Sequence, residues 1–495
     1  MAEKRATAQE STVLAVAILA SFVVFLDGSI VNVAVSGIGK DLGGGLSLQQ
    51  WVVDSYTLSL AAFILLAGGL YDTYGRAAVL RAGLIGFGVA SLGCAIAPDG
   101  TSLVIFRGFQ GLAGALLIPG SLALIASTFR GAAQARAIGR WSAWTSASFI
   151  AGPMLGGVFV DTLGWRWVFG INVVPVAVTL LVLQRLKPTV NSTSTARVDL
   201  VGALTGVLGL GGIVFALIEQ ERLGWSNPLV LSSVLVGGIA VVVFLLWESR
   251  VQAPMMPLNL FRNRVFWTGN LATFLIWGPL YLGVFIIPVF LQQVVGYSAT
   301  AAGAATAPMT IISIAVSSTV GSLAGKHGPR WFVTAGPVIA AIGYLWMATV
   351  HSPLNIWMQI LPGIMLVGFG IATTSTPLTT SVLSSVGAAQ AGIGSAVNNA
   401  VSRVAGLVAV ALLGMITGGT LDYAGFRRVV AVVALFMLLG AGVAAFGMRG
   451  IAGSGADADP DGTDQLSDTL EDDAPDGIPA AAAPFPASPA TALEP

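Results

Sequence analysis

Long apolar runs recur along almost the whole chain, separated by short charged or Pro/Gly-rich segments. A helix needs about 20 consecutive apolar residues to cross the hydrocarbon layer of a bilayer. The runs predict fourteen membrane helices, at residues 13–34, 48–70, 79–97, 102–128, 136–160, 167–186, 200–218, 229–247, 266–291, 300–324, 332–350, 355–382, 392–418 and 428–448. The alternating ten-residue segments of a membrane β-barrel do not occur in the sequence. The pattern therefore predicts an all-α integral membrane protein.

The basic residues between these helices favour one orientation. With the N-terminus in the cytoplasm, sixteen lysines and arginines fall in cytoplasmic segments and five fall outside, while Arg107 and Arg403 lie within helices. An excess of Lys and Arg on the cytoplasmic side is the usual bias of membrane proteins. We therefore expect a multi-pass protein of the inner (plasma) membrane with both termini in the cytoplasm.

Composition changes this picture in two ways. Of the 495 residues, 55% are hydrophobic and 9% are charged, and the mean hydropathy is +0.85; a soluble domain carries about 25% charged residues. The net charge of zero hides an asymmetry, because residues 1–449 hold 23 basic and 13 acidic residues and ten acids follow in the tail. The tail is rich in Ala, Pro and Asp, so we expect it to be disordered. The single cysteine, Cys94, excludes a disulfide.

A short sequence occurs twice in the chain, 253 residues apart. GGLYDTYGR (68–76) and GSLAGKHGPR (321–330) both lie where the second helix of a six-helix block would reach the cytoplasm. Many secondary transporters are built from two such halves, with the binding site between them. The repeat predicts a cytoplasmic N-terminus at 1–12, a first six-helix bundle at 13–186, two inserted helices with linkers at 187–265, a second bundle at 266–449 and the tail at 450–495.

Two acidic residues lie deep within expected helices. Asp27 is about fourteen residues into the first helix, and Asp54 is about two turns into the second, on one face with Gln50 and Thr57. An aspartate at the centre of a membrane helix costs about 2.5–3.5 kcal/mol. A carboxyl that is neutral in one conformation and charged in another can couple movement to protons. A fixed ion pair, with Arg107 as the partner, or a hydrogen bond at a helix kink are the alternatives.

The first copy of the repeat resembles the G-x-L-a-D-r-x-G-r-k loop of the major facilitator superfamily. Gly68, Leu70, Asp72, Gly75 and Arg76 are in register with that loop, whereas Thr73 stands where a basic residue is usual. The resemblance implies that Asp72 and Arg76 form a latch that breaks when the two halves rock. The alternative is an ordinary tight turn with a solvated Asp–Arg pair, which contributes little stability.

Two further motifs follow in the superfamily's order. LVIFRGFQGLAGA (103–115) resembles its fourth-helix motif, with Arg107 and Gln110 on one helix face. SFIAGPMLGG (148–157) resembles the fifth-helix motif of antiporters; its matching residues are Gly152, Pro153, Gly156 and Gly157. Small residues four apart let helices approach closely. For the fourth-helix motif, the alternative is that the arginine extends to the membrane interface. For the fifth-helix motif, the alternative is simple helix packing.

The wider resemblance is to the fourteen-helix drug:proton antiporters of this superfamily. It rests on FLDGSIVNVAV, WVVDSYTL (51–58), WRWVFGINVVP (165–175) and SAVNNAVSRVAG (395–406), and it covers residues 13–449. Some members carry acids in helix thirteen, where this chain has Asn398, Asn399 and Arg403. We therefore expect no preference for strongly cationic drugs. The candidates for lining a cavity are these three residues together with Gln110 and Trp144.

The sequence thus predicts a major facilitator fold of two six-helix bundles plus two inserted helices. The expected function is proton-coupled export of amphiphilic drugs, antibiotics or similar small molecules, with Asp27, Asp54 and Arg107 as coupling residues. The alternative is a major facilitator that moves one metabolite, sugar or lipid precursor. An intramembrane aspartyl protease is much less favoured, because the second part of its signature is missing. We expect no enzymatic activity, no cofactor or metal, no nucleic-acid partner, and a monomer driven by the proton gradient.

Overall fold

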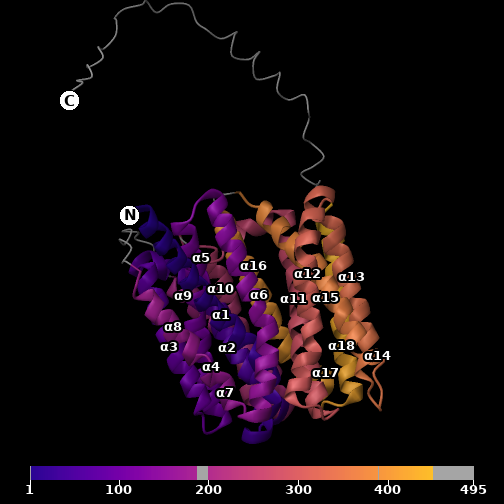
Figure 1. The fold of residues 1–495 in the computed structure, drawn as a ribbon. Coiled ribbons are helices and arrows are strands. Elements are labelled where there is room, and N and C mark those ends of the chain that lie inside the picture. The colour runs from indigo at the N-terminus through magenta and orange to yellow at the C-terminus, as the bar shows by residue number, and fades with distance from the viewer. Residues whose placement is uncertain (1, 187–198, 253, 388–389, 450–495) are drawn as a thin grey trace, which may run out of the picture. The chain divides into compact units, whose positions relative to one another are not determined.

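The computed structural model describes residues 2–186, 199–252, 254–387 and 390–449. The surroundings of a few helical residues, including residues 68 and 72, also lie outside the described part. The described residues form helices and connecting turns (Figure 1). The expectation of a disordered tail concerns residues 450–495 and lies outside the described residues.

The first half of the chain forms eight helices, because two of the expected spans are each divided in two. They are α1 (Ala2–Leu42), α2 (Gly45–Tyr74), α3 (Arg76–Ala95), α4 (Gly100–Ala115), α5 (Leu117–Thr128), α6 (Gly131–Thr162), α7 (Arg166–Gly170) and α8 (Val173–Leu183). The inserted segment forms α9 (Leu200–Leu223) and α10 (Pro228–Glu248).

The second half also forms eight helices. It consists of the 3-10 turn η1 (Leu258–Arg262) and then α11 (Arg264–Gln293), α12 (Ala299–His327), α13 (Arg330–Met347), α14 (Ile356–Gln359), α15 (Leu361–Ser384), α16 (Ala391–Ala411), α17 (Leu413–Thr417) and α18 (Tyr423–Gly447). Within the described residues, twelve helices are long and apolar enough to cross a membrane. The remaining two expected spans, at 48–70 and 332–350, fall in α2 and α13. A multi-pass helical protein is confirmed, and the count of fourteen stays a prediction.

Equivalent helices of the two halves pack in equivalent ways. In the first half α1 packs on α6 and α8, and α4 packs on α2 and α3; in the second half α11 packs on α16 and α18, and α15 packs on α12 and α13. The halves meet along α6 with α12 and α2 with α16, which are exchanged when the halves are exchanged. This exchange is the relationship expected of two repeats with the same orientation, related by a two-fold axis along the membrane normal.

The repeated loop has the same backbone in both halves. Gly75, after α2, has φ 83° and ψ 145°, and Gly328, after α12, has φ 84° and ψ 147°. Residues with a side chain rarely adopt this conformation, and glycine adopts it without strain. Both copies therefore use a glycine to reverse the chain between the second and third helix of their half.

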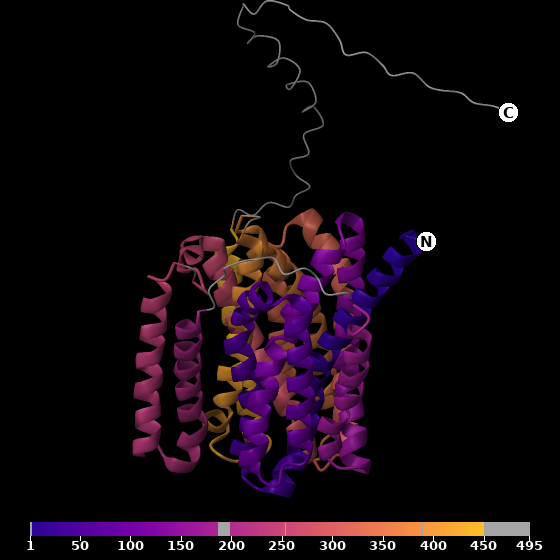
Figure 2. The same ribbon diagram turned by 90° about the vertical axis from the view of Figure 1, so that its left-hand side faces the viewer.

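The inserted helices form a hairpin at the side of the molecule (Figure 2). α9 packs on α10 and also contacts α2, α16 and α17, so it touches both halves. Its contact with α2 combines apolar packing, with the Trp51 and Phe215 ring centres 5.9 Å apart, and hydrogen bonds, because the Glu219 carboxylate accepts from Trp51 Nε1 at 2.9 Å and Ser47 Oγ at 3.3 Å. The hairpin is thereby fixed to the first half.

Candidate functional site

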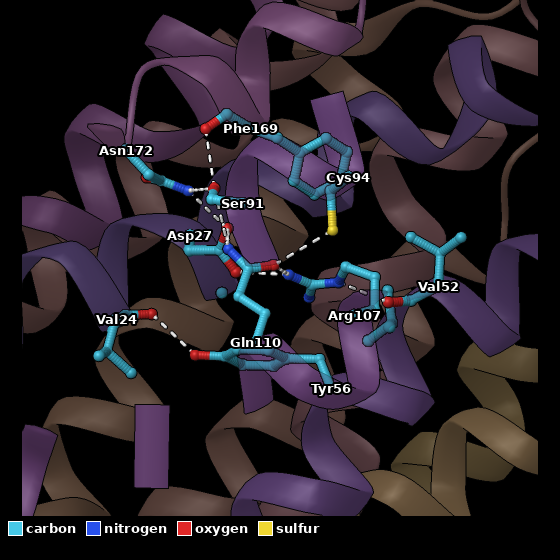
Figure 3. A network of polar contacts seen from close by, with 12 residues as sticks. Val24, Asp27, Val52, Tyr56, Ser91, Cys94, Arg107, Gln110, Phe169 and Asn172 are labelled. Carbon is cyan, nitrogen blue, oxygen red and sulfur yellow. Dashed lines mark hydrogen bonds and ion pairs between the residues drawn. The ribbon is translucent and has the colours of Figure 1, made fainter. Parts of the chain in front are cut away.

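The first-half core contains a buried ion pair between α1 and α4 (Figure 3). Arg107 Nη1 lies 2.6 Å from Asp27 Oδ2, and the two side chains are 1% and 0% exposed. Arg107 Nε also donates to the Val52 carbonyl of α2 at 2.9 Å, and its guanidinium carbon lies 4.2 Å from the centre of the Tyr56 ring. The arginine therefore connects α1, α2 and α4. These partners compensate its charge, which would be costly to bury unpaired within a membrane helix.

Two amide side chains complete the coordination of the Asp27 carboxylate. Gln110 Nε2 donates to Asp27 Oδ1 at 2.9 Å, and Asn172 Nδ2, between α7 and α8, donates to the same oxygen at 2.8 Å. Gln110 Oε1 in turn accepts from Arg107 Nη1 at 2.8 Å. With donors from three side chains, the ionised form of Asp27 is well compensated in this conformation.

Ser91 of α3 holds the two amides in place. Its hydroxyl accepts from Gln110 Nε2 at 3.2 Å and from Asn172 Nδ2 at 3.1 Å, and donates to the Phe169 carbonyl at 2.8 Å. Sequence reasoning missed Ser91 and Asn172 as members of this network. Asn172 offered a signal, because it is a polar residue within the WRWVFGINVVP stretch; a serine in a membrane helix is too common to be one.

Gly111 explains how α4 brings Arg107 so close to the α2 backbone. A Cβ on Gly111 would lie 2.9 Å from the Tyr56 carbonyl carbon and would collide with the carbonyl oxygen. The missing side chain lets the two helices touch through their backbones, one turn after Arg107. The guanidinium can then bond to Val52 and cover the Tyr56 ring.

Asp54 has a different environment from Asp27, although both are buried. It is 1% exposed, and neither of its carboxylate oxygens has a hydrogen-bond partner among the described residues. Gln50, one turn earlier, points instead to the second half, and Thr57 Oγ1 donates to its own helix at Val53. The expected stripe of Gln50, Asp54 and Thr57 is therefore not joined by hydrogen bonds.

The antiporter-type motif presents its small residues to two different helices. Gly152 and Gly156 face α1, where a Cβ on Gly156 would lie 2.9 Å from the Ile30 carbonyl oxygen. Gly157 faces α12 of the other half, where a Cβ would lie 2.6 Å from the Ala299 carbonyl oxygen. Pro153 also reaches α12, because its carbonyl stands where a Cβ of Gly303 would be. The motif thus packs both within its half and across the two halves.

The other candidate residues do not converge on Asp27. Asn398 is buried and donates to Asn270 Oδ1 at 3.1 Å and Thr273 Oγ1 at 2.9 Å, which ties α16 to α11. Asn399 and Trp144 are exposed, and Arg403 is half-buried. Their role in lining a cavity stays a prediction.

The residues of the repeated loop lie at the turn between α2 and α3 that is described above. Gly75 ends α2 and Arg76 begins α3, whereas the surroundings of Gly68 and Asp72 lie outside the described part. The latch between Asp72 and Arg76 stays a prediction. Among the described residues, no group of three His, Cys, Asp or Glu side chains is placed to hold a metal ion.

Comparison with known proteins identifies relatives that cover most of the chain. Residues 17–410 match the Major Facilitator Superfamily. The chain is 34% identical over 420 residues to the puromycin resistance protein pur8 of Streptomyces alboniger, with 83% of this chain and 82% of that protein covered. It is also 34% identical over 406 residues to the multidrug resistance protein Stp of Mycobacterium tuberculosis (strain CDC 1551 / Oshkosh), with 82% and 75% covered.

A solved structure supports the fold independently of close sequence similarity. The auto-inhibited peptide transporter of the POT family is 14% identical and aligns with a TM-score of 0.65, covering 89% of this chain and 96% of that one. The predicted major facilitator fold is confirmed. Because the sequence match extends over most of the described helices and the helix packing agrees with it, the chain belongs to the Major Facilitator Superfamily.

Proposed function

We propose that the protein is a proton-coupled secondary transporter that exports amphiphilic drugs, antibiotics or similar small molecules by alternating access. Two relatives that share a third of their residues with it are named for resistance to puromycin and to multiple drugs. Transport in such folds occurs between two halves that rock about a central site. The protein works as a monomer in the plasma membrane, with both termini in the cytoplasm.

The observation that carries proton coupling is the contrast between the two buried aspartates. Asp27 receives hydrogen bonds from Arg107, Gln110 and Asn172, so its negative charge is satisfied and the group is held in place. Asp54 is equally buried and has no donor among the described residues. An unpaired buried carboxylate is strongly destabilised, so the neutral acid is the form that suits Asp54 in this conformation.

This contrast supports different roles for the two acids. Asp54 lies on α2, one turn from Gln50, which bonds across to α16. When α2 and α16 separate, water reaches this region and the charged form of Asp54 becomes favourable. Asp54 is therefore our candidate for the proton carrier, and Asp27 with Arg107 forms the fixed element that keeps α1, α2 and α4 together.

Drug uptake into inside-out membrane vesicles tests the proposal. A fluorescent amphiphilic dye is expected to accumulate when the vesicle interior is acidic, and to leave again when a protonophore removes the pH gradient. Vesicles that lack the protein give the background. Uptake that is unchanged by the protonophore would refute proton coupling, and no uptake across a panel of dyes and antibiotics would refute multidrug export.

A further inference from the structure

The inserted hairpin reaches the junction of the two halves through Glu221, in the last turn of α9. α9 contacts α2 of the first half and both α16 and α17 of the second half. A Cβ on Gly414 of α17 would collide with Glu221 Oε2, and a Cβ on Gly419 would lie 2.9 Å from Glu221 Oε1. The two glycines thus leave the space that the Glu221 carboxyl group occupies.

The Glu221 carboxyl group has a buried oxygen without a donor. Its Oε2 is shielded from solvent and has no hydrogen-bond partner among the described residues. Glu219, two residues earlier, differs, because it accepts from α2 and pairs with Arg222 at 2.9 Å. A buried carboxylate oxygen that has lost its water and gained no donor is destabilised. The neutral acid is therefore the form that suits Glu221 while the junction is closed.

Gln50 of α2 adds a second unpaired acceptor at the same place. Its Nε2 donates to the Val410 and Ala411 carbonyls of α16 at 2.7 and 3.1 Å, which holds the halves together there. Its Oε1 is buried and has no partner among the described residues. This oxygen lies 3.8 Å from the Cβ position of Gly414, with which Glu221 Oε2 overlaps. A proton on Glu221 removes a charge and supplies a donor where both groups otherwise only accept.

The charged groups on the surrounding helices leave Glu221 unpaired. Arg222 is taken up by Glu219, and Arg428 Nη2 of α18 donates to the Thr417 carbonyl at 2.6 Å. Within the described residues, Glu221 forms no ion pair. The charged residues of the helices packed around it are Glu219 and Arg222 on α9, Asp54 on α2, Arg403 on α16 and Glu248 at the far end of α10, and α17 has none.

We propose that Glu221 is a proton-binding site that the inserted hairpin contributes to transport, neutral when the α2–α16 interface is closed at this end and ionised when it is open. The proposal rests on the proposed function, and the basic-residue bias places this end outside. Because closure takes up a proton, a lower pH shifts the equilibrium toward the closed state. Protons from outside thus close the outward-open protein after the drug has left, which gives the two extra helices a part in coupling.

Distances between spin labels at two exposed positions test this role, Thr101 at the start of α4 and Ala424 at the start of α18. The protein is reconstituted in lipid without drug, in a background of Cys94→Ala and Asp54→Asn, so that Asp54 adds no response of its own. Between pH 8 and pH 5 we expect the ratio of closed to open protein to rise roughly fivefold or more, the ratio that corresponds to one unsatisfied buried group.

Glu221→Gln replaces the acid by a neutral residue of the same size. We expect it to show the higher closed fraction at both pH values. Asp41→Asn is the matched control, because it changes an acid to an amide at the same end of the molecule, where Asp41 pairs with Arg166 instead of facing the junction. This control is expected to keep the full pH response.

Gly414→Ala tests the same site with the acid retained. Its Cβ would take the position of Glu221 Oε2, the end of a flexible side chain, so the carboxyl group should move out of the junction and the pH response should shrink. Gly238→Ala on α10 is the control, since a Cβ there meets nothing within 4 Å. If Glu221→Gln does not fold, this pair of variants still decides.

A Glu221→Gln variant that responds to pH like its background, or a background that does not respond, would overturn the proposal. Exchange of choline for sodium at constant pH and ionic strength should leave the ratio unchanged. A sodium effect that Glu221→Gln abolishes would show that a metal ion is the ligand and would also overturn the proposal. A normal pH response in a protein that shows no proton-driven drug uptake would refute the proposed function alone.

Discussion

Arg107 and Asp27 lie 2.6 Å apart between α4 and α1, and neither side chain is more than 1% exposed. Removal of one partner from a buried ion pair leaves an uncompensated charge and costs about 3–5 kcal/mol. We expect Arg107→Met to destabilise the protein by about that amount, because the Asp27 carboxylate keeps only its two amide donors. Thermal unfolding of the detergent-solubilised protein measures the loss.

The double variant distinguishes a pair from two independent contacts. If Asp27→Asn accompanies Arg107→Met, no buried charge is left without a partner, and the loss should be clearly smaller than the sum of the two single losses. Additive losses would show that the pair does not act as a unit. Expression level and gel filtration confirm that the variants being compared are folded.

Gly111 gives a second prediction, because the space for its side chain is already occupied by the α2 backbone. Gly111→Ala is expected to push α2 away and to destabilise the protein by about 1–3 kcal/mol, the usual cost of overpacking. Gly139→Ala on α6 is the matched control, since a Cβ there meets nothing within 4 Å. Equal melting temperatures for the two variants would contradict the close approach of α2 and α4.

Much of the fold was predictable because a membrane helix is specified locally. The apolar runs gave the membrane helices, and the shared motif gave the turns at Gly75 and Gly328, which have matching dihedral angles. The breaks between α4 and α5 and between α7 and α8 were not predicted. The break between α4 and α5 lies in an apolar run that no polar residue interrupts, with Pro119 close by, and the break between α7 and α8 falls at the single polar residue Asn172, three residues before Pro175.

The site was less predictable, because hydrogen-bond partners depend on how helices rotate against each other. The sequence predicts Arg107 as a partner for Asp27, since both are costly in a membrane and each compensates the other. Ser91 joined the site only through the packing of α3 on α4 and α8.

Asp54→Asn tests which aspartate carries the proton. An amide cannot exchange a proton, so the variant should lose dye uptake driven by a pH gradient, while exchange of dye down its own gradient continues. The control is Asp99→Asn at the exposed N-cap of α4, where the Ser102 backbone N–H lowers the pKa of the carboxyl. Asparagine also caps helices well, so this variant should retain full uptake. If Asp54→Asn also retained it, the carrier would have to be sought elsewhere, and Asp27, despite its three donors, would be the next candidate.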